Sequence, residues 1–504
     1  MTSVPALLAG LESRGIILFL AEGEIRYRSP KDALTPADRE ALRARRADIL
    51  GYLTARGGAK SLRAAQGAGG PLTTSVAQEM WWRFAGGAKE GEPVALNIGM
   101  AGTFRADAAA VTAAVRQVIG RHDALRVGFR AEGEVLHPSL NPAGDFEIAQ
   151  EDLRGLGADA AAQAAGQRAR EFGGQVNFIE GRWLTRAKVF ALPEGQALAV
   201  ISAAHMIADA GTRNIVLDEL RDILEHGAPQ AAPSVPYNDY SLAERAILAG
   251  PQGAALIDHW RRWYEAQPPM LAPSDKTVLL WGNGVRIIRN FSIPGRVLRR
   301  IRTLADELKV TPFLVCLTIF SIAMARWSGM DRFAVRILGD KRTTGELSNT
   351  VGLMFCADAV QVYAPAGWDF ETILRGILAE YDAALGLRIP SLHFWAPHCV
   401  RPGIEANDFP NRIPAVFNYY SVGTARERAE KQPVPDTAQD WPPQIHELPP
   451  QTWPCRSSPL FLHLMDYGSE MAASLHFYEN VVSKPDQDAF TAMLFQTFDD
   501  VVPA

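Results

Sequence analysis

The sequence predicts an α/β protein of several domains, and three observations lead to this prediction. The chain of 504 residues is too long for one hydrophobic core. From about residue 72 onwards, segments with helical apolar spacing alternate with short apolar runs typical of buried strands. The first fifty-odd residues carry their own helix–strand–strand–helix pattern, and a Gly/Ala-rich linker at residues 57–71 separates them from the rest.

Residues 1–56 are predicted to form a small αββα domain. After a short first helix come two strands, at 16–20 and 25–28, joined by a four-residue turn. The Thr-Pro-Ala-Asp segment at 35–38 supplies a cap, a proline at the first helical position and an acid in the first turn of the closing helix. Such a small core is marginally stable alone, which favours a module that works by binding another molecule.

The remainder of the chain alternates between predicted helices and predicted strands. Helical periodicity covers residues 107–120, 158–171, 212–226, 296–309, 313–327, 370–385 and 486–500. Strands are predicted at residues 94–100, 183–191, 197–203, 284–292, 333–338, 413–419 and 471–477. The stretch 401–456 is rich in proline and charge, and we expect it to form mostly long loops.

Composition and charge argue against several classes of protein. A net charge of -5 does not suit nucleic acid as a main partner, because phosphate binding needs a basic surface. The four cysteines lie far apart without CxxC spacing, which predicts reduced thiols, and the scattered histidines predict no metal site. No apolar run reaches membrane-spanning length and the N-terminus lacks signal-peptide features, so we expect a cytoplasmic protein without a membrane partner.

The most informative segment is Ala-Ala-His-Met-Ile-Ala-Asp-Ala-Gly-Thr at 203–212. His205 ends a predicted buried strand, where its imidazole can face a cavity, and Asp209 can support the loop that follows. By itself this spacing is a weak signal, because a histidine beside apolar residues is more often a satisfied core group. A buried Asp209 would also need a charged partner, which predicts an arginine from a distant part of the chain.

Four further segments occur in order around His205: Thr-Ser-Val-Ala-Gln-Glu-Met-Trp at 74–81, Arg-His-Asp-Ala-Leu-Arg-Val-Gly-Phe at 121–129, Tyr-Asn-Asp-Tyr at 237–240 and Asn-Thr-Val-Gly-Leu-Met-Phe-Cys at 349–356. Together they resemble the condensation domains of nonribosomal peptide synthetases, in which a core His-His-x-x-x-Asp-Gly lies between the same flanking motifs. The resemblance covers about residues 72–500.

This resemblance implies two chloramphenicol-acetyltransferase-like lobes in a V-shaped pseudo-dimer. The lobes would span residues 72–240 and 275–504, with a connection at 241–274. A tunnel between them would admit the phosphopantetheine arms of a donor and an acceptor carrier protein. The implied reaction joins a donor acyl or peptidyl thioester to an acceptor aminoacyl thioester through an amide bond, with no cofactor bound directly to the chain.

The resemblance also implies roles for single residues. His205 matches the catalytic histidine, which acts as general base or orients the amine and stabilises the tetrahedral intermediate. Asp209 matches the structural aspartate, with Arg342 as the candidate partner and Arg336 as the second choice. Asn418 is a candidate for lining the tunnel and binding the oxyanion or amide.

The core motif departs from the family pattern at two positions. Ala204 stands where the first histidine is expected, and the glycine comes one step late, as Gly211, where it could absorb the turn. Three interpretations of Ala204 stay open: a packing change costing about 1–3 kcal/mol, an engineered change, or an altered reaction. Two alternatives to condensation of two carrier-bound substrates stand. One is an impaired or silent recruitment platform, which Ala204 suggests, and the other is an acyltransferase that forms an amide or ester with a free amine or alcohol.

The first fifty-odd residues separately resemble the N-terminal docking domains found on hybrid polyketide/peptide synthases. The resemblance is carried by Gly-Ile at 15–16, Arg-Tyr-Arg at 26–28 and a proline at 30, and it implies binding of the C-terminal tail of an upstream synthase. Arg26, Arg28 and Lys31 lie on or just after a strand that could pair with an acidic tail by charge and strand addition. The alternative is a solvated strand edge that positive charge protects from aggregation.

Overall fold

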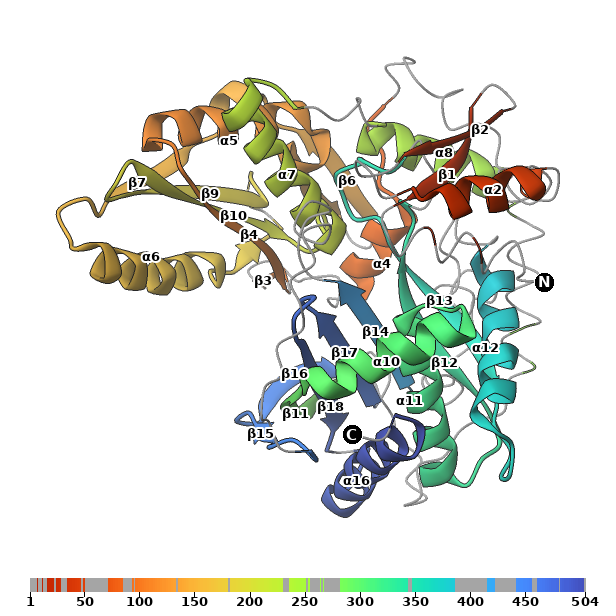
Figure 1. Cartoon of the computed structure of the whole chain (residues 1–504). Coiled ribbons are helices and arrows are strands. Elements are labelled where there is room, and N and C mark those ends of the chain that lie inside the picture. Colours follow the sequence, from red (N-terminus) through yellow and green to blue (C-terminus); the bar gives the residue numbers. More distant parts are fainter. Residues whose placement is uncertain are drawn as a thin grey trace. The chain divides into compact units, whose positions relative to one another are not determined.

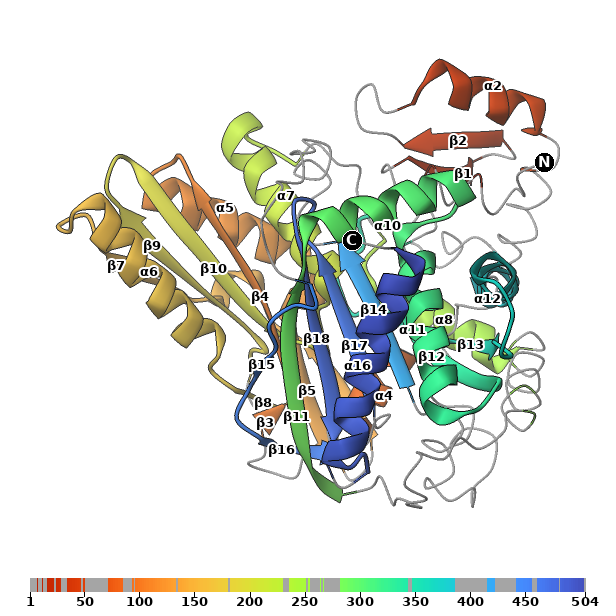
Figure 2. The same cartoon turned by 60° about the horizontal axis from the view of Figure 1, so that its bottom comes forward.

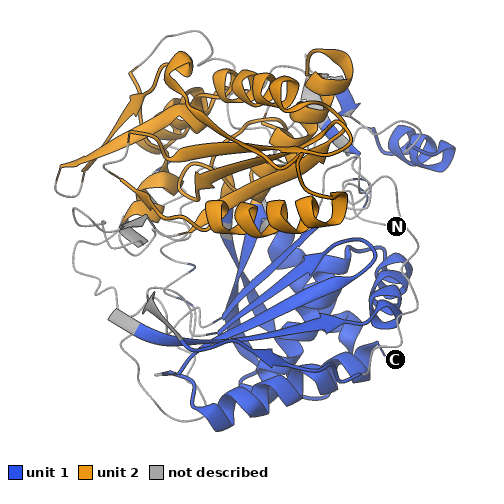
Figure 3. Cartoon of the chain, turned by 90° about the vertical axis from the view of Figure 1, so that its left-hand side faces the viewer, with its two compact units in different colours: residues 1–58, 251–339, 356–504 blue, residues 59–250, 340–355 orange. Residues whose placement is uncertain are grey.

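The computed structural model describes most of the chain (Figure 1). The described residues are 7, 11, 16–21, 24–28, 34–46, 49, 71–84, 93–94, 96–132, 135–179, 182–229, 235–250, 253, 263, 266, 282–342, 347–385, 415–421, 441–455, 460–479 and 481–502. Lys31, nearly all of the 57–71 linker and most of 251–274 lie outside them. The chain divides into two compact units: unit 1 holds Met1–Gly58, Pro251–Gly339 and Cys356–Ala504, and unit 2 holds Ala59–Gly250 and Asp340–Phe355 (Figure 3).

The N-terminal region has the predicted strand pair and closing helix (Figure 2). Strands β1 (Ile17–Ala21) and β2 (Glu24–Arg28) pair in antiparallel fashion. Helix α2 (Pro36–Ala44) begins with a capping box, in which the Thr35 side chain accepts the Asp38 N–H and the Asp38 carboxylate accepts the Thr35 N–H. This region has a small core of its own, made of Leu11, Ile16, Leu18, Leu34 and Ile49.

Unit 2 is built around a four-stranded sheet with the order β4-β10-β9-β7. Its strands are β4 (Asn97–Phe104), β10 (Gln196–Ala204), β9 (Thr185–Leu192) and β7 (Ile148–Asp152). Neighbours pair in antiparallel fashion except β7, which runs parallel to β9. Helices α5 (Ala108–Arg121) and α7 (Ala210–His226) cover one face, and α6 (Ala158–Gly173) covers the other (Figure 1).

Shorter elements complete unit 2. They are the helices α4 (Val76–Phe84) and α8 (Tyr237–Ala249), the strand pairs β3 (Pro93–Val94) with β8 (Asn177–Phe178) and β5 (Val127–Glu132) with β6 (Val135–Leu140), and the 3-10 turns η2 (Asp123–Arg126) and η3 (Ala143–Asp145). The turn η2 lies directly after α5, within the Arg-His-Asp-Ala-Leu-Arg motif. The motif therefore ends a helix, as its sequence predicts.

Unit 1 contains an eight-stranded sheet with four helices packed on one face (Figure 2). The strand order is β13 (Phe355–Tyr363), β12 (Arg332–Asp340), β14 (Ala415–Ser421), β17 (Leu460–Asp466), β18 (Met471–Tyr478), β11 (Gly282–Ile293) and β15 (His446–Glu447), with β16 (Gln451–Cys455) also on β11. The helices are α10 (Gly295–Leu308), α11 (Pro312–Ser328), α12 (Phe370–Leu385) and α16 (Lys484–Val501). Phe320 of α11, Phe417 of β14 and Phe490 of α16 meet in the shared core.

Helices α10 and α11 both contribute side chains to this core. Among the described residues no single helix is both long and apolar enough to cross a membrane, and α10 with α11 reaches that length only as a pair bent by 105°. The expectation of mostly long loops over 401–456 was wrong for β15 and β16. Both pair with β11, and an outer strand such as β16 tolerates Pro454 because its N–H side need not join a ladder.

Candidate functional site

Asp209 and Arg342 form a buried ion pair within unit 2. Two guanidinium nitrogens of Arg342, Nη1 and Nη2, donate to the two carboxylate oxygens of Asp209 at 3.0 and 2.9 Å. Asp209 also caps helix α7 by accepting the Thr212 N–H at 2.8 Å, and it accepts the Met354 N–H at 2.7 Å. Burial alone would raise the pKa of Asp209, but Arg342 and these amides together lower it, so the carboxylate stays charged.

Gly211 is required here for close approach. It is the second residue of α7, and a Cβ atom built on it would lie 2.3 Å from Arg342 Nη1 and 2.9 Å from Asp340 Oδ2. Its φ is not positive, so it does not absorb the turn as the sequence suggested. The glycine instead leaves room for the guanidinium over the first turn of the helix.

His205 lies at the C-terminal end of β10 with its imidazole half-buried. Its backbone N–H donates to the Leu96 carbonyl at 3.0 Å, and its ring Nδ1 lies 2.8 Å from the Ala208 carbonyl oxygen. A carbonyl oxygen only accepts, so Nδ1 carries the proton of the neutral ring and Nε2 keeps its lone pair. Desolvation lowers the pKa of His205 below 6.5, against the smaller raising effects of its hydrogen bonds and Asp209, so the ring is neutral at pH 7.

Ala204, directly before His205, is fully buried at the end of β10, and its N–H donates to the Leu184 carbonyl at 2.8 Å. A methyl group neither donates nor accepts a proton. In this motif, therefore, His205 is the side chain that can do proton chemistry.

The four flanking motifs meet at Tyr237, the first residue of α8. Its hydroxyl lies 2.8 Å from Ser75 Oγ and donates to the Leu353 carbonyl at 2.9 Å. Its backbone N–H donates to Asp123 at 3.0 Å, and a Cβ atom on Gly352 would overlap its ring. The motifs thus build the frame that holds α4, α8 and the 349–356 segment together.

Sequence reasoning missed a second buried ionic group in unit 2. Lys341 Nζ donates to the Tyr240 hydroxyl at 2.7 Å, and that hydroxyl donates to Glu244 Oε1 at 2.6 Å. Glu244 also accepts the N–H of Val76, the first residue of α4, at 2.7 Å. The four-residue spacing of Tyr240 and Glu244 in α8 was visible in the sequence, but the partner Lys341 lies 97 positions beyond Glu244.

Asn418 lies on β14 in unit 1. Its Nδ2 is 3.3 Å from His463 Nε2, on the sheet face opposite to the one that buries Phe417.

In the N-terminal region, Arg26 is exposed on β2, and Arg28 ends that strand. Within the described ranges, no group of three or more His, Cys, Asp or Glu side chains could hold a metal ion.

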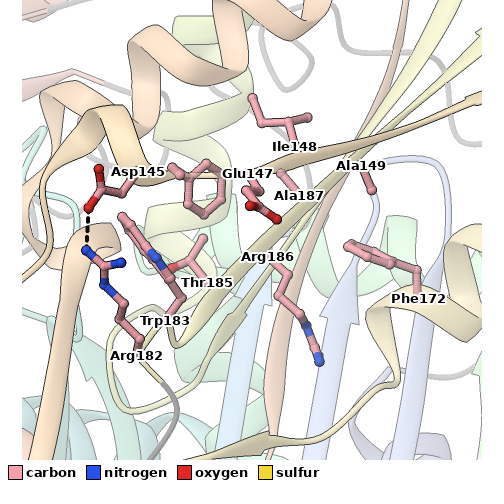
Figure 4. A pocket seen from close by; sticks show the side chains of 11 residues that line it. Asp145, Glu147, Ile148, Ala149, Phe172, Arg182, Trp183, Thr185, Arg186 and Ala187 are labelled. Atoms are coloured by element: carbon pink, nitrogen blue, oxygen red, sulfur yellow. Dashed lines mark hydrogen bonds and ion pairs between the residues drawn. The ribbon is translucent and has the colours of Figure 1, made fainter.

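A pocket of about 500 Å³ lies elsewhere in unit 2, between β7, β9 and the end of α6 (Figure 4). The rings of Phe146 and Trp183 pack in its wall at a centroid distance of 4.9 Å, and Arg182 pairs with Asp145 at its rim. His205 does not line it. The pocket is therefore separate from the His205 site.

Comparisons with known proteins agree with the two resemblances. The Condensation domain family matches residues 72–380, and the TubC N-terminal docking domain family matches residues 4–54. A structure solved in a study of condensation domain-mediated chain release from the enacyloxin polyketide synthase is 34% identical, with a TM-score of 0.78 over 99% of this chain and 95% of that one. The EpoB cyclization-docking bidomain from Sorangium cellulosum, 20% identical, shares the fold with a TM-score of 0.63 over 98% of this chain and 97% of that one.

Among curated proteins, phosphinothricin tripeptide synthetase PhsC from Streptomyces viridochromogenes is 26% identical over 332 residues, which cover 63% of this chain and 30% of PhsC. The matched part therefore spans less than a third of that relative's length. Because the family match takes in more than half of the chain and a docking-domain match precedes it, the chain belongs to the condensation-domain family and carries an N-terminal docking domain of the TubC type.

Proposed function

We propose that this chain transfers an acyl group from the thioester of an upstream carrier protein to a nucleophile that His205 activates. The observation that carries this proposal is the state of His205: a neutral ring whose Nδ1 is bonded to the Ala208 carbonyl, which leaves Nε2 free to accept a proton. The Asp209–Arg342 pair would hold the loop that positions the ring.

The proposed reaction needs one proton acceptor. An amine or hydroxyl would donate a hydrogen bond to Nε2 of His205 and attack the thioester carbonyl. The proton would pass to Nε2 as the tetrahedral intermediate forms, and His205 would return it to the departing phosphopantetheine thiolate. Because a thioester is already activated, orientation of the nucleophile and proton acceptance suffice.

For the acceptor we favour a soluble amine or alcohol, so that the reaction releases the chain. The support is likeness over 99% of the chain to a structure whose subject is chain release. A carrier-bound aminoacyl thioester is the second candidate, supported by the 26% identity to the tripeptide synthetase PhsC. Asn418 is proposed to bond the oxyanion or the acceptor, and β2 to bind the tail of the upstream synthase.

The test is a turnover assay with the full chain and acyl-loaded carrier protein, in which mass spectrometry follows loss of the acyl group. Soluble amines, soluble alcohols and aminoacyl-loaded carrier are offered separately as acceptors. His205→Ala should lower turnover about 10²- to 10⁴-fold, whereas His226→Ala, an exposed histidine at the end of α7, should have no effect.

Each outcome of this assay has a definite meaning. Unchanged turnover in His205→Ala would refute the catalytic role of His205. If the wild-type protein binds the acyl-loaded carrier but forms no product with any of the acceptors offered, the result would instead support the silent platform suggested by Ala204. The acceptor that gives product decides between chain release and amide formation on a second carrier.

A further inference from the structure

We propose that Trp81 is a positioning residue that, together with Phe355, clamps the His205 imidazole in one orientation and keeps water away from it. The Trp81 ring of α4 lies 4.5 Å from the His205 ring, with an interplanar angle of 42°. Phe355, at the start of β13, lies 5.9 Å from His205 and 6.0 Å from Trp81. The three rings are therefore in mutual contact, and we call Trp81 and Phe355 the aromatic clamp.

The clamp restrains a rotation of the His205 ring that its hydrogen bonds leave possible. The bond from Nδ1 to the Ala208 carbonyl fixes one ring atom, but the ring can still pivot about it. Two aromatic rings at different angles to the imidazole oppose that pivot and cover it with apolar surface. Nε2 is thereby held in place, and the neutral form is favoured because a charged imidazolium loses more solvation in such surroundings.

Charged neighbours do not explain why the neutral form of His205 is favoured. Asp209 raises the pKa of His205, and its own charge is paired with Arg342. Glu79, on the same helix as Trp81, accepts a hydrogen bond from the Thr74 hydroxyl and pairs with Arg245. Removing apolar cover should therefore raise the pKa of His205 and not lower it.

The effect of the clamp on the turnover rate rests on the proposed function, whereas its effect on the pKa and orientation of the His205 ring does not. The test uses the full chain labelled with ¹³C/¹⁵N-histidine, with the His205 signal assigned by its loss in His205→Ala. In Trp81→Leu the His205 pKa should rise toward 6.5, and the two ring tautomers should both become populated. Trp81→Phe, which keeps an aromatic ring at this position, should leave the His205 pKa and tautomer close to those of the wild type. Trp183→Leu is the matched control, because it removes a tryptophan that packs on Phe146 in the same unit.

Kinetics give the second readout. In Trp81→Leu the acidic limb of the pH–rate profile should move to higher pH. The kcat should fall by up to about fourfold at pH 6 and largely recover at pH 8, because a ring with a pKa near 6.5 is about one quarter neutral at pH 6 and nearly all neutral at pH 8. A merely structural role would lower kcat equally at all pH values. Phe355→Leu should shift the profile in the same direction by a smaller amount, and it provides the test if Trp81→Leu fails to fold.

The outcomes separate the two proposals. An unmoved His205 pKa in folded Trp81→Leu or Phe355→Leu overturns the clamp, whatever the activity. A shifted pKa supports the clamp even if His205→Ala keeps full turnover, in which case the proposed function alone fails.

Discussion

At the scale of single residues, Arg342 lies so close to Gly211 that there is no room for even the methyl group of an alanine at this position. All three guanidinium nitrogens of Arg342 already donate hydrogen bonds, so the group cannot easily move away from a new Cβ atom. We expect Gly211→Ala to lower the free energy of unfolding by about 1–3 kcal/mol, measured by urea denaturation. Gly166→Ala in α6 is the control, because its Cβ would meet nothing closer than 3.7 Å and should stabilise the helix by about 0.5–1 kcal/mol. Equal effects would show that the close approach to Arg342 is not what requires glycine.

The carboxylate of Asp209 should link stability to pH. Because its folded pKa is lowered, it stabilises the protein above the unfolded value near 3.8, and this contribution is lost as pH falls through the lower folded pKa. Asp209→Asn should lower the free energy of unfolding by about 3–5 kcal/mol at pH 7, since Arg342 then loses its buried partner, and the loss should shrink below pH 4.

The control for Asp209→Asn is a second helix cap. Asp107 caps α5 by accepting the Ala110 N–H at 2.7 Å, and asparagine caps a helix about as well as aspartate. Asp107→Asn should therefore change the denaturation midpoint very little at either pH. A similarly small change in Asp209→Asn would mean that capping, and not the ion pair, is what Asp209 supplies.

At the scale of elements, strong apolar periodicity predicted helices and strands well, and weak periodicity did not. Helix α11, whose sequence is apolar almost throughout, lies within two residues of its predicted bounds. Strand β7, Ile-Ala-Gln-Glu-Asp, was missed because it pairs on one side only and is largely exposed, so its sequence need not alternate. Strand β17 was also missed. Its side chains alternate regularly between buried and half-buried, but the strand follows a proline-rich stretch that suggested loops.

The candidate site shows the same division between local and long-range information. Residues 203–212, taken together with the flanking motifs, indicated His205 and Asp209, and the local bonds of these two side chains to Ala208 and Thr212 lie within that segment. The clamp, the Glu244–Lys341 group and the reason for Gly211 depend on contacts between segments about 100 positions or more apart, which no local pattern encodes.

Strand β2 carries the prediction for the docking region. Arg26 is exposed on β2, and in the described sheet β2 pairs with β1. We propose that the tail adds as a strand along the other edge of β2. Arg26→Glu should weaken binding of an acidic C-terminal peptide from the upstream synthase at least tenfold at low salt, and the difference should shrink at high salt. Fluorescence anisotropy would measure this, with Arg43→Glu on the exposed side of α2 as control. Equal weakening by both variants would indicate general charge attraction without a defined binding edge.

At the scale of the whole molecule, docking and acyl transfer should be separable, because the N-terminal region closes its own small core. Tethering the upstream synthase raises the effective concentration of its carrier protein, so deletion of residues 1–56 should raise KM for the carrier-bound donor at least tenfold and leave kcat nearly unchanged. Turnover with a small soluble pantetheine thioester, which needs no tether, should not change. An excess of the free tail peptide should inhibit the intact chain with the carrier-bound donor but not with the soluble one. Equal loss with both donors after deletion would place the defect in the fold of the large region, and loss with neither would show that the docking domain does not deliver the donor.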